Sequence, residues 1–338
     1  MGVVKADAYG HGAVPVARVL EAEGVRRLAV ATVPEAVELR KAGLESRILV
    51  LGAPLPAFLP AYERHGLEAV VSSLEVADAV VGRGVAVHVK VDTGMHRLGI
   101  PPEQAGATVG ALLEAGVVVE AVWTHLATAD AADPSFALEQ VQHFDAALEA
   151  VPDSVRVHVA NGPAHVRLPR VTSRPALVRL GGVLYGLRSD PAMAPSTAYL
   201  RPAMRLVTRV VHLQTVPAGE TVSYGRTWTA PRPTRIATLA VGYADGLPRA
   251  LSNAGTVGLE APDPVRRPIV GRVCMDMMMV ALEDEDAVEV GDDAVVFGAG
   301  GPSAERQAGA AGTISYELTC SVAPRVPRVW LGGERAAG

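Results

Sequence analysis

The sequence predicts an α/β protein, a parallel (β/α)8 barrel followed by a C-terminal all-β domain. Up to about residue 190, short apolar runs rich in β-branched residues alternate with segments whose apolar residues recur at helical spacing. After about residue 201, the pattern changes to strands separated by turn signals. We therefore expect domains at 1–195 and 196–338, joined by the Pro-, Ser- and Ala-rich stretch RSDPAMAPSTAYLRP.

Eight apolar runs in the first part have the continuous hydrophobicity of parallel strands that are covered on both faces. They are Val3–Lys5, Leu28–Thr32, Ile48–Gly52, Glu68–Ser72, Val85–Asp92, Val119–His125, Val155–Asn161 and Leu177–Tyr185. The intervening segments, such as AVPVARVLEAEG and PSFALEQVQHFDAALEAVP, read as helices, with Pro near several starts and Gly at ends. Eight strand–helix units favour a closed barrel over an open sheet.

The second part contains the strand candidates MRLVTRVVHLQTV, RIATLAVGYA, RPIVGRVCMDMMMVAL and DAVVFG. Pro-Ala-Gly-Glu and Val-Gly-Asp-Asp supply turn signals between them. This pattern predicts a compact β domain.

Composition excludes several classes of function. A chain of 338 residues with 49% hydrophobic residues, 20% charged residues and a formal net charge of -5 has no basic face for nucleic acid. It also lacks both an apolar run of ~18 residues and the apolar core of a signal peptide, so we expect no membrane partner and a cytoplasmic location. Cys274 and Cys320 lie in unrelated contexts, which argues against a metal site or a disulfide framework.

The candidate chemistry lies where apolar strands end, because a barrel places its active site at the carboxyl ends of its strands. The polar residues there include Lys5, Arg97, His125, His158, Asn161 and Arg179, with Gly181 and Gly182 following. Lysine is rare: Lys5, Lys41 and Lys90 are the only three among 31 basic residues. Lys41 lies on a polar helical face. Lys5 could form a Schiff base with a carbonyl compound, or it could make an ordinary ion pair.

Several motifs in order along nearly the whole chain carry a resemblance to one family. They are VVKADAYGHG, VKVDTGMHRLG, WTHLATAD, VHVANG, VRLGGVLYG, TVSYGRTW, VGYADGLPR and GRVCMDM. Together they resemble the alanine racemases. That family interconverts L-alanine and D-alanine with pyridoxal 5'-phosphate and supplies D-alanine for peptidoglycan.

The resemblance assigns a role to each candidate residue. It implies that Lys5 carries the cofactor and that Lys5 and Tyr224 are two catalytic bases on opposite faces of the substrate. The implied cofactor-binding residues are Lys5, Tyr9, His125, Asn161, Arg179, Gly181 and Gly182, and the implied substrate-binding residues are Arg97, Tyr243, Met275 and Asp276. Lys90 matches a lysine that is often carbamylated, with a plain Lys90–Asp92 surface pair as the alternative. The family's shared active sites imply a homodimer.

The sequence departs from the family pattern at three places. Gly162 stands where the family has a serine that binds the cofactor phosphate, and Pro324 stands where many members have a phosphate-binding tyrosine. Both changes predict weaker cofactor retention. Backbone N–H groups around Gly181 and Gly182, together with Tyr9, could bind the phosphate in their place. Only four residues precede Lys5, so we expect a strand and a helix of the family to be missing and apolar barrel surface to be uncovered, which costs several kcal/mol at ~25 cal/mol per Å2.

Four other functions remain open. A broad-specificity amino-acid racemase is the nearest, but such enzymes tend to be exported. A pyridoxal-dependent decarboxylase would have an acidic residue where Arg179 stands. A pyridoxal-phosphate-binding homeostasis protein would lack the β domain and Tyr224. An inactive or truncated remnant would keep the motifs without the activity.

Overall fold

The computed structural model describes residues 1–331 apart from 169–170, 172–173 and 175. The chain divides into two compact units. Unit 1 contains the described residues of 1–184, 190–198 and 330–331, and unit 2 contains residues 185–189 and 199–329. The domain limits 1–195 and 196–338 stay a prediction.

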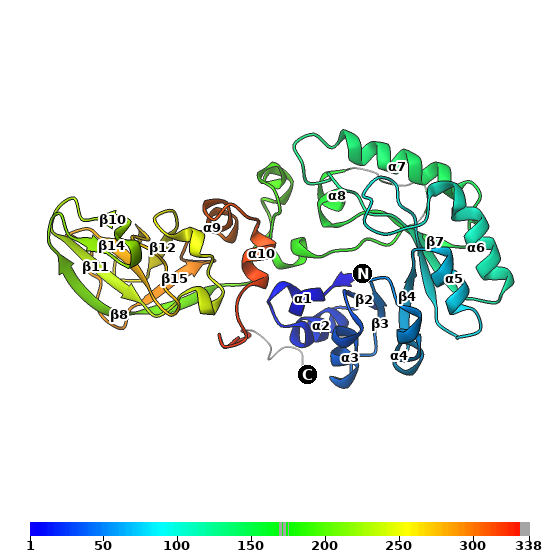
Figure 1. The fold of residues 1–338 in the computed structure, drawn as a ribbon, viewed down its shortest axis with the longest axis horizontal. Coiled ribbons are helices and arrows are strands. Elements are labelled where there is room, and N and C mark those ends of the chain that lie inside the picture. Colours follow the sequence, from blue (N-terminus) through cyan, green and yellow to red (C-terminus); the bar gives the residue numbers. More distant parts are fainter. Residues whose placement is uncertain (169–170, 172–173, 175, 332–338) are drawn as a thin grey trace. The chain divides into compact units, whose positions relative to one another are not determined.

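Unit 1 is built on a sheet of seven parallel strands that pair in chain order (Figure 1). The strands are β1 (Gly2–Val3), β2 (Arg27–Val30), β3 (Arg47–Val50), β4 (Leu67–Val71), β5 (Val87–Lys90), β6 (Val119–Trp123) and β7 (Arg156–His158). β4 and β5 are buried at every residue, so their polar side chains Glu68, His88 and Lys90 lie inside unit 1 together with the apolar ones.

The eighth segment closes the barrel without forming a ladder. Single bridges join Arg179 to Asn161 beside β7, and Leu180 to Gly2 in β1. The expected strand Leu177–Tyr185 is therefore wrong in its second half, which forms the 3-10 helix η3 (Gly182–Tyr185). The segment pairs with each neighbour over too few residues for a regular strand. The barrel itself is confirmed.

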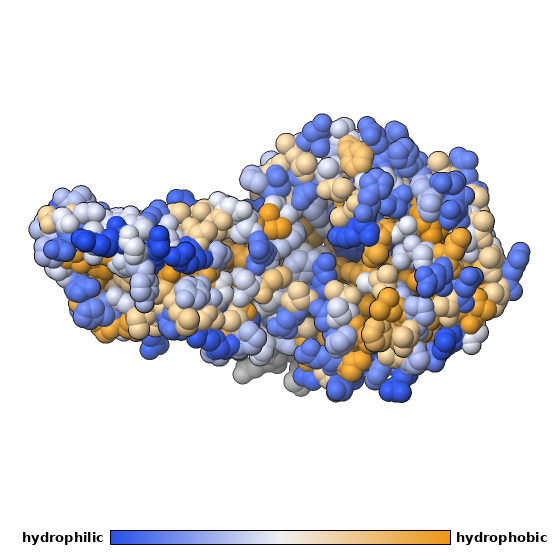
Figure 2. All heavy atoms as spheres, viewed as in Figure 1, coloured by the Kyte–Doolittle hydropathy of each residue, from blue (hydrophilic) through white to orange (hydrophobic). Residues whose placement is uncertain are grey.

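Helices follow the strands and lie on the outside of the sheet (Figure 1). They are α2 (Ala13–Ala22), α3 (Val33–Lys41), α4 (Leu59–His65), α5 (Leu74–Val80), α6 (Ala105–Glu114), α7 (Ser135–Leu148) and α8 (Gly162–Arg167). The segment labelled α1 (Lys5–Tyr9) is a short turn with left-handed backbone angles. Polar and apolar residues are interspersed over their outward surface (Figure 2). The short 3-10 helices η4 (Pro191–Met193) and η5 (Pro195–Thr197) also belong to unit 1, where Met193 and Thr197 are fully buried.

A layer of apolar side chains fills the barrel from different strands. Val3, Ala29, Leu49, Val70 and Trp123 form one cluster, and none is more than 6% exposed. Burial of each large apolar side chain contributes about 1.5–3 kcal/mol. This layer fixes the positions at which the strands end, and the candidate active-site residues follow those ends.

Unit 2 contains a six-stranded antiparallel sheet in the order β13-β12-β15-β8-β11-β14 and a small β10-β9 pair. Its strands are β8 (Leu206–Val216), β9 (Thr221–Val222), β10 (Trp228–Thr229), β11 (Thr234–Leu239), β12 (Thr256–Leu259), β13 (Val265–Pro268), β14 (Met278–Leu282) and β15 (Asp293–Phe297). The β domain is confirmed, but it also contains the helices α9 (Ala304–Ala310) and α10 (Ser315–Cys320). The Ser303 hydroxyl caps α9 by accepting from the Arg306 amide.

Two features of the described residues bear on membrane and metal partners. Within the described part of the chain, no helix is both long and apolar enough to cross a membrane. The same residues contain no group of three or more His, Cys, Asp or Glu side chains that could hold a metal ion.

Candidate active site

Lys5 lies at the start of a strained turn at the mouth of the barrel. It comes two residues after β1, which ends at Val3, so the expectation that Lys5 itself ends the strand is corrected. Residues 6–9 all have φ between 52 and 55 degrees, which is the left-handed helical region. A non-glycine residue in this region costs about 1–2 kcal/mol. Four in succession indicate a backbone that its surroundings hold in place, as is common at functional sites.

Carboxylates from two segments hold this turn. Glu35, in the first turn of α3, accepts the Ala6 amide at 2.7 Å with one oxygen. Its other oxygen accepts the Ala31 and Thr32 amides at 2.7 and 3.0 Å. Asp7 accepts the Ala13 amide at 2.7 Å. The residue directly after Lys5 is therefore fixed by a side chain from the next strand–helix unit.

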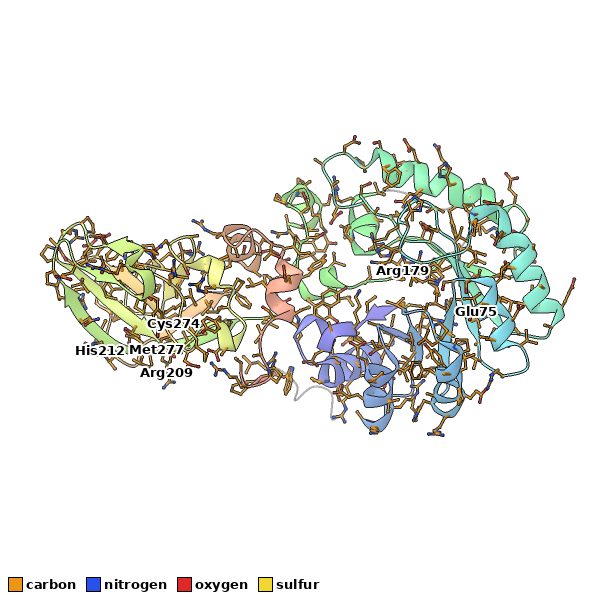
Figure 3. The ribbon with its side chains drawn as sticks, in the orientation of Figure 1. Glu75, Arg179, Arg209, His212, Cys274 and Met277 are labelled. Atoms are coloured by element: carbon orange, nitrogen blue, oxygen red, sulfur yellow. The ribbon has the colours of Figure 1, made fainter. Side chains whose placement is uncertain are left out.

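Arg179 extends into the barrel from the eighth segment and is only 3% exposed (Figure 3). Its guanidinium donates to the Nδ1 atoms of His158 at 2.8 Å and His125 at 3.2 Å. It also donates to the carbonyl oxygens of Thr124, His158 and Val159 at 2.9–3.0 Å. Burial, followed by the charge of Arg97, lowers the pKa of Arg179 to about 9, so it remains a cation at neutral pH.

These bonds fix the histidine tautomers, because an arginine can only donate. His158 accepts at Nδ1 and must therefore carry its proton on Nε2, which lies 2.9 Å from Nδ1 of His88. His88 in turn carries its proton on Nε2 and donates to Glu68 at 2.8 Å. A directed chain thus connects Arg179 to Glu68 through two buried histidines.

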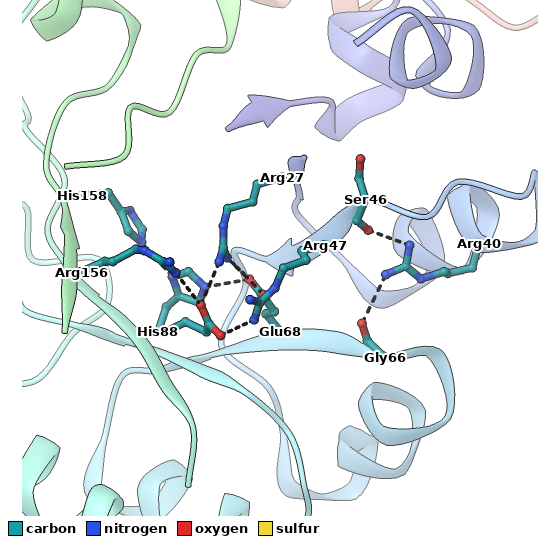
Figure 4. Close-up of polar contacts among 10 residues, drawn as sticks. Arg27, Arg40, Ser46, Arg47, Gly66, Glu68, His88, Arg156 and His158 are labelled. Atoms are coloured by element: carbon teal, nitrogen blue, oxygen red, sulfur yellow. Dashed lines mark hydrogen bonds and ion pairs between the residues drawn. The ribbon is translucent and has the colours of Figure 1, made fainter. Parts of the chain in front are cut away.

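At Glu68, this series of hydrogen bonds meets a cluster of ion pairs across β2, β3, β4 and β6 (Figure 4). Glu68 pairs with Arg27 at 3.2 Å and with Arg47, and both arginines also pair with Glu120, at 2.8 and 2.5 Å. Arg156 pairs with Glu120 from β7 at 3.2 Å. The carboxylate charge of Glu68, which is 4% exposed, is therefore compensated within the barrel.

Positive charge concentrates around His125. Burial, then the charges of Arg179, Arg97, Lys90 and Lys5, hold the pKa of His125 well below its ordinary value of 6.5. Burial and Arg179 do the same for the pKa of His158. Both rings are neutral at physiological pH, which agrees with their acceptor roles toward Arg179. The predicted residues on five different strand ends do converge on one region.

Lys90 is buried inside the barrel. Its side chain is 1% exposed, and its Nζ atom has no hydrogen-bond partner among the described residues and lies 5.0 Å from the Trp123 ring centroid. Burial lowers its pKa to about 8, opposed by Asp92 and assisted by Arg179 and Arg97. Asp92 instead accepts the amides of Gly94 and His96. The alternative of a Lys90–Asp92 surface pair is therefore wrong.

Asn161 and Gly162 begin α8. Asn161 caps the helix by accepting the Ala164 amide at 3.0 Å, and its amide group donates to the Leu126 carbonyl at 3.2 Å. The described contacts of Asn161 are thus those of a helix cap. A Cβ atom on Gly162 would lie 2.9 Å from a methyl group of Val183, so there is little room for a serine here.

Tyr9 and Gly181 form a small cradle. A Cβ atom on Gly181 would collide with the Tyr9 hydroxyl, so glycine is required for this close approach. Gly182 begins η3, where first-turn amides lack helical acceptors. A phenolic hydroxyl and free backbone N–H groups are suitable donors to a phosphate. These residues fit the phosphate end of the implied cofactor.

The remaining predicted residues lie in unit 2, on loops that contact one another. Tyr224, in η6 (Tyr224–Arg226), is 72% exposed, and Tyr243, in η7 (Tyr243–Asp245), is 42% exposed. The Tyr243 amide donates to the Cys274 carbonyl at 3.0 Å, which places Tyr243 beside Met275 and Asp276. Ser223 donates to the Arg272 carbonyl at 2.6 Å and so ties the Tyr224 loop to the same segment.

Sequence reasoning missed Trp123, His88, Glu68 and Glu35. The Trp123 ring stacks on His158 at 5.1 Å with an 18° interplanar angle, and Arg179 lies over it at 4.8 Å. Trp123 and His88 each stand two residues before a predicted site residue on an inward-facing strand position, a spacing that could have indicated them. Glu35 offered no comparable signal, because its contact with Ala6 spans 29 residues.

The fold and site together define a class: a barrel with a lysine at its mouth, a buried arginine and a close contact between Tyr9 and Gly181, followed by a β domain. Family models agree. The model "Alanine racemase, N-terminal domain" matches residues 1–189, and "Alanine racemase, C-terminal domain" matches residues 203–330.

Individual proteins are similar over nearly the whole chain. The alanine racemase of Chlorobaculum tepidum is 46% identical, with 97% of this chain and 88% of that protein covered. Among solved structures, the biosynthetic alanine racemase of Pseudomonas aeruginosa is 35% identical with a TM-score of 0.89, covering 97% of this chain and 91% of that one. The alanine racemase of D-cycloserine-producing Streptomyces lavendulae is 38% identical with a TM-score of 0.87, and the match covers 100% of this chain and 92% of that one. The chain belongs to the alanine racemase family.

Proposed function

We propose that this protein interconverts L-alanine and D-alanine, with pyridoxal 5'-phosphate bound to Lys5. The observation that carries the proposal is that Arg179 is bonded to His125 at 3.2 Å, on a ring whose pKa the charges of Arg97, Lys90 and Lys5 also lower. Pyridoxal phosphate, when bound, withdraws electrons from the substrate Cα and so makes its proton acidic. A cytoplasmic location and a role in D-alanine supply for peptidoglycan are part of this proposal.

Each end of the cofactor would have donors of this chain. The Tyr9 hydroxyl and the backbone N–H groups around Gly181 and Gly182 would hold the phosphate. Arg179 would face the ring nitrogen. Because Arg179 is held by five hydrogen bonds and stays charged at neutral pH, it donates and does not give up a proton. The ring nitrogen would remain unprotonated, which favours simple return of a proton to Cα.

Lys5 and Tyr224 would exchange protons with opposite faces of Cα. The amine of Lys5 would take or deliver the proton on one face, and the Tyr224 phenol on the other. The resemblance places the tyrosine in the partner subunit, so we propose a homodimer with shared active sites. The exposure of Tyr224, Tyr243 and Met275, at 72%, 42% and 52%, supports this, because large side chains exposed together are typical of interfaces.

Lys90 would be carbamylated. With a pKa of about 8, a buried amine is neutral in an appreciable fraction of molecules near neutral pH. The neutral amine can add to carbon dioxide with loss of one proton, which converts a buried cation into an anion. That anion would lie near Arg97 and Arg179, compensate their charge and orient Arg97 toward the substrate carboxylate.

The test is the appearance of D-alanine from L-alanine with added cofactor, measured by chiral chromatography. Lys5→Ala should abolish it, and Lys41→Ala, which removes an exposed lysine, should not. Borohydride reduction of the loaded protein followed by peptide mapping should label Lys5 alone among the three lysines. Labelling of Lys90 or Lys41 instead, or racemisation that survives Lys5→Ala, would contradict the proposal.

A further inference from the structure

The C-terminal part of unit 2 packs on the turn that carries Tyr243. The Ala323 amide donates to the Asp245 carbonyl at 3.0 Å, and the Ser321 hydroxyl donates to the Gly246 carbonyl at 2.7 Å. Gly246 has φ of 103 degrees and no room for a Cβ atom, because the Ser321 carbonyl occupies that space. The segment 321–325 and the turn 242–246 are therefore fixed against each other.

The same turn is joined to the loop that carries Met275 and Asp276. In addition to the Tyr243–Cys274 bond, the Ala244 amide donates to the Met275 carbonyl at 2.9 Å. Cys274 and Met277, which flank Met275 and Asp276, are labelled in Figure 3. The residues proposed to face the substrate thus lie on two loops in direct backbone contact.

Arg325 connects these loops through their charges. Its Nε atom donates to Asp245 at 2.7 Å, and its Nη2 atom donates to Asp276 at 2.8 Å. The arginine side chain is 47% exposed, and those of Asp245 and Asp276 are 15% and 57% exposed. The two ion pairs raise the pKa of Arg325, so the cation is permanent.

We propose that Arg325 is a positioning residue for substrate binding: it joins the Tyr243 turn to the Asp276 loop and compensates part of the charge of their two carboxylates. This inference rests on the proposed function. The carboxylate of alanine is an anion, and an unpaired Asp276 or Asp245 close to its path would repel it. One guanidinium bound to both acids reduces that repulsion and fixes the spacing of the loops.

Loss of Arg325 should affect substrate binding and not the stability of the fold. Exposed ion pairs contribute little to folding, so loss of Arg325 should leave the protein folded. Arg232 is a matched control, because it is 44% exposed, lies in the same unit and also pairs with two acids, Glu283 and Asp284. The carboxylates paired with Arg232 do not lie on the loops of Tyr243 or Asp276.

The experiment compares Arg325→Met, Arg325→Lys and Arg232→Met in the cofactor-loaded protein. Arg325→Met should raise KM for alanine by about three- to tenfold with a smaller change in kcat. The increase should shrink at ~1 M salt, where the Debye length is about 3 Å. Arg325→Lys should recover part of the loss, and Arg232→Met should behave like the unaltered protein.

Hydrogen exchange supplies a readout without substrate. The Tyr243 and Ala244 amides should exchange faster in Arg325→Met than in Arg232→Met, because only their backbone bonds to residues 274 and 275 would then join the loops. Unchanged KM and unchanged exchange in Arg325→Met would overturn the inference. If the unaltered protein fails to racemise alanine, the proposed function and the substrate role of Arg325 both fail, while the exchange comparison still decides whether Arg325 joins the loops.

Discussion

At the scale of single residues, the three lysines show how position determines chemistry. Lys41 is exposed on α3, Lys5 is half-buried at the barrel mouth, and Lys90 is buried. The scarcity of lysine indicated that Lys5 and Lys90 have special roles, but only the structure shows that Lys90 lies inside the barrel without a hydrogen-bond partner among the described residues. Its charge is therefore a cost to folding, and that cost can be measured.

Lys90→Met should stabilise the cofactor-free protein at neutral pH. A lowering of the pKa from 10.5 to about 8 corresponds to up to about 3 kcal/mol. Below about pH 8 the amine is protonated in both the folded and the unfolded chain, and the full cost of the buried charge is present. Between about pH 8 and 10.5 only the unfolded chain binds the proton, so stability rises with pH. The variant should lose this rise, as measured by urea unfolding from pH 7 to 10.

Carbamylation would reduce this difference, so the measurement requires buffers depleted of carbon dioxide and a repeat with added bicarbonate. Lys41→Met is the control, because an exposed lysine should change stability by no more than about 0.5 kcal/mol. If Lys90→Met is less stable than the unaltered protein and keeps the rise above pH 8, the buried amine is not a cost.

Gly162 offers a second prediction at this scale. Restoring the family's serine alone should not tighten cofactor binding, because its Cβ would lie 2.9 Å from Val183. Gly162→Ser combined with Val183→Ala makes room for the hydroxyl and should lower the dissociation constant for pyridoxal phosphate by about fivefold or more, the worth of one hydrogen bond of ~1 kcal/mol. Equilibrium dialysis measures this, with Val183→Ala alone as the control. Equal tightening by Gly162→Ser alone would contradict the steric argument.

At the scale of secondary-structure elements, one buried network connects the strands. Burial alone would raise the pKa of Glu68, but the hydrogen bond from His88 and the charges of Arg27 and Arg47 lower it overall. A carboxyl group with a lowered pKa stabilises the fold above its ordinary value of 4.5, and the contribution is lost as the pH falls through the lowered value. The network therefore supports the barrel at neutral pH and weakens in acid.

Glu68→Gln should destabilise unit 1 by about 3–5 kcal/mol at neutral pH, because it leaves Arg27 and Arg47 short of a buried counter-charge. Thermal unfolding should also depend less on pH below about 4.5 than in the unaltered protein. Glu63→Gln removes an acid that pairs with Arg83 at the surface, and it should change stability by less than about 1 kcal/mol. Similar effects of both substitutions would show that Glu68 has no special role.

The sequence predicted the regular elements well and the irregular ones poorly. Strands β2 to β7 were recognised because each contains or adjoins a short run rich in aliphatic and β-branched residues, and the predicted helices α2, α3, α6 and α7 follow apolar spacing. The left-handed turn after Lys5 was not predictable, because alanine, aspartate and tyrosine disfavour that region and Glu35 imposes it from another element. The prediction of an eighth strand was wrong in part because this segment pairs with its neighbours only through single bridges.

In the candidate site, too, some residues could be predicted from the sequence and others could not. Residues that close strands, such as Lys5, His125 and Arg179, were found because a barrel brings strand ends together. Residues that hydrogen-bond to these strand-end residues were not predicted. His88 and Glu68 lie within strands, and their hydrogen bonds depend on three-dimensional contacts between β4, β5 and β7. Asn161 was expected to bind the cofactor, and its described bonds show it capping α8.

At the scale of the whole molecule, the two proposed bases lie in different units. Lys5 belongs to unit 1 and Tyr224 to unit 2, and each unit is compact by itself. No sequence pattern states whether the two residues act within one chain or across two. The homodimer remains a prediction from the family resemblance, and it has a direct consequence for mixed populations of variants.

Mixing Lys5→Ala with Tyr224→Phe should restore activity that neither variant has alone. If each active site combines Lys5 of one subunit with Tyr224 of its partner, a mixed dimer contains one site with both defects and one intact site. Random exchange makes about half of the dimers mixed, so the recovered activity should approach roughly one quarter of that of the unaltered protein. Each variant should first be shown by light scattering to dimerise and by circular dichroism to be folded. If the mixture stays inactive although subunits exchange, both bases act within one chain, and the shared-site proposal fails.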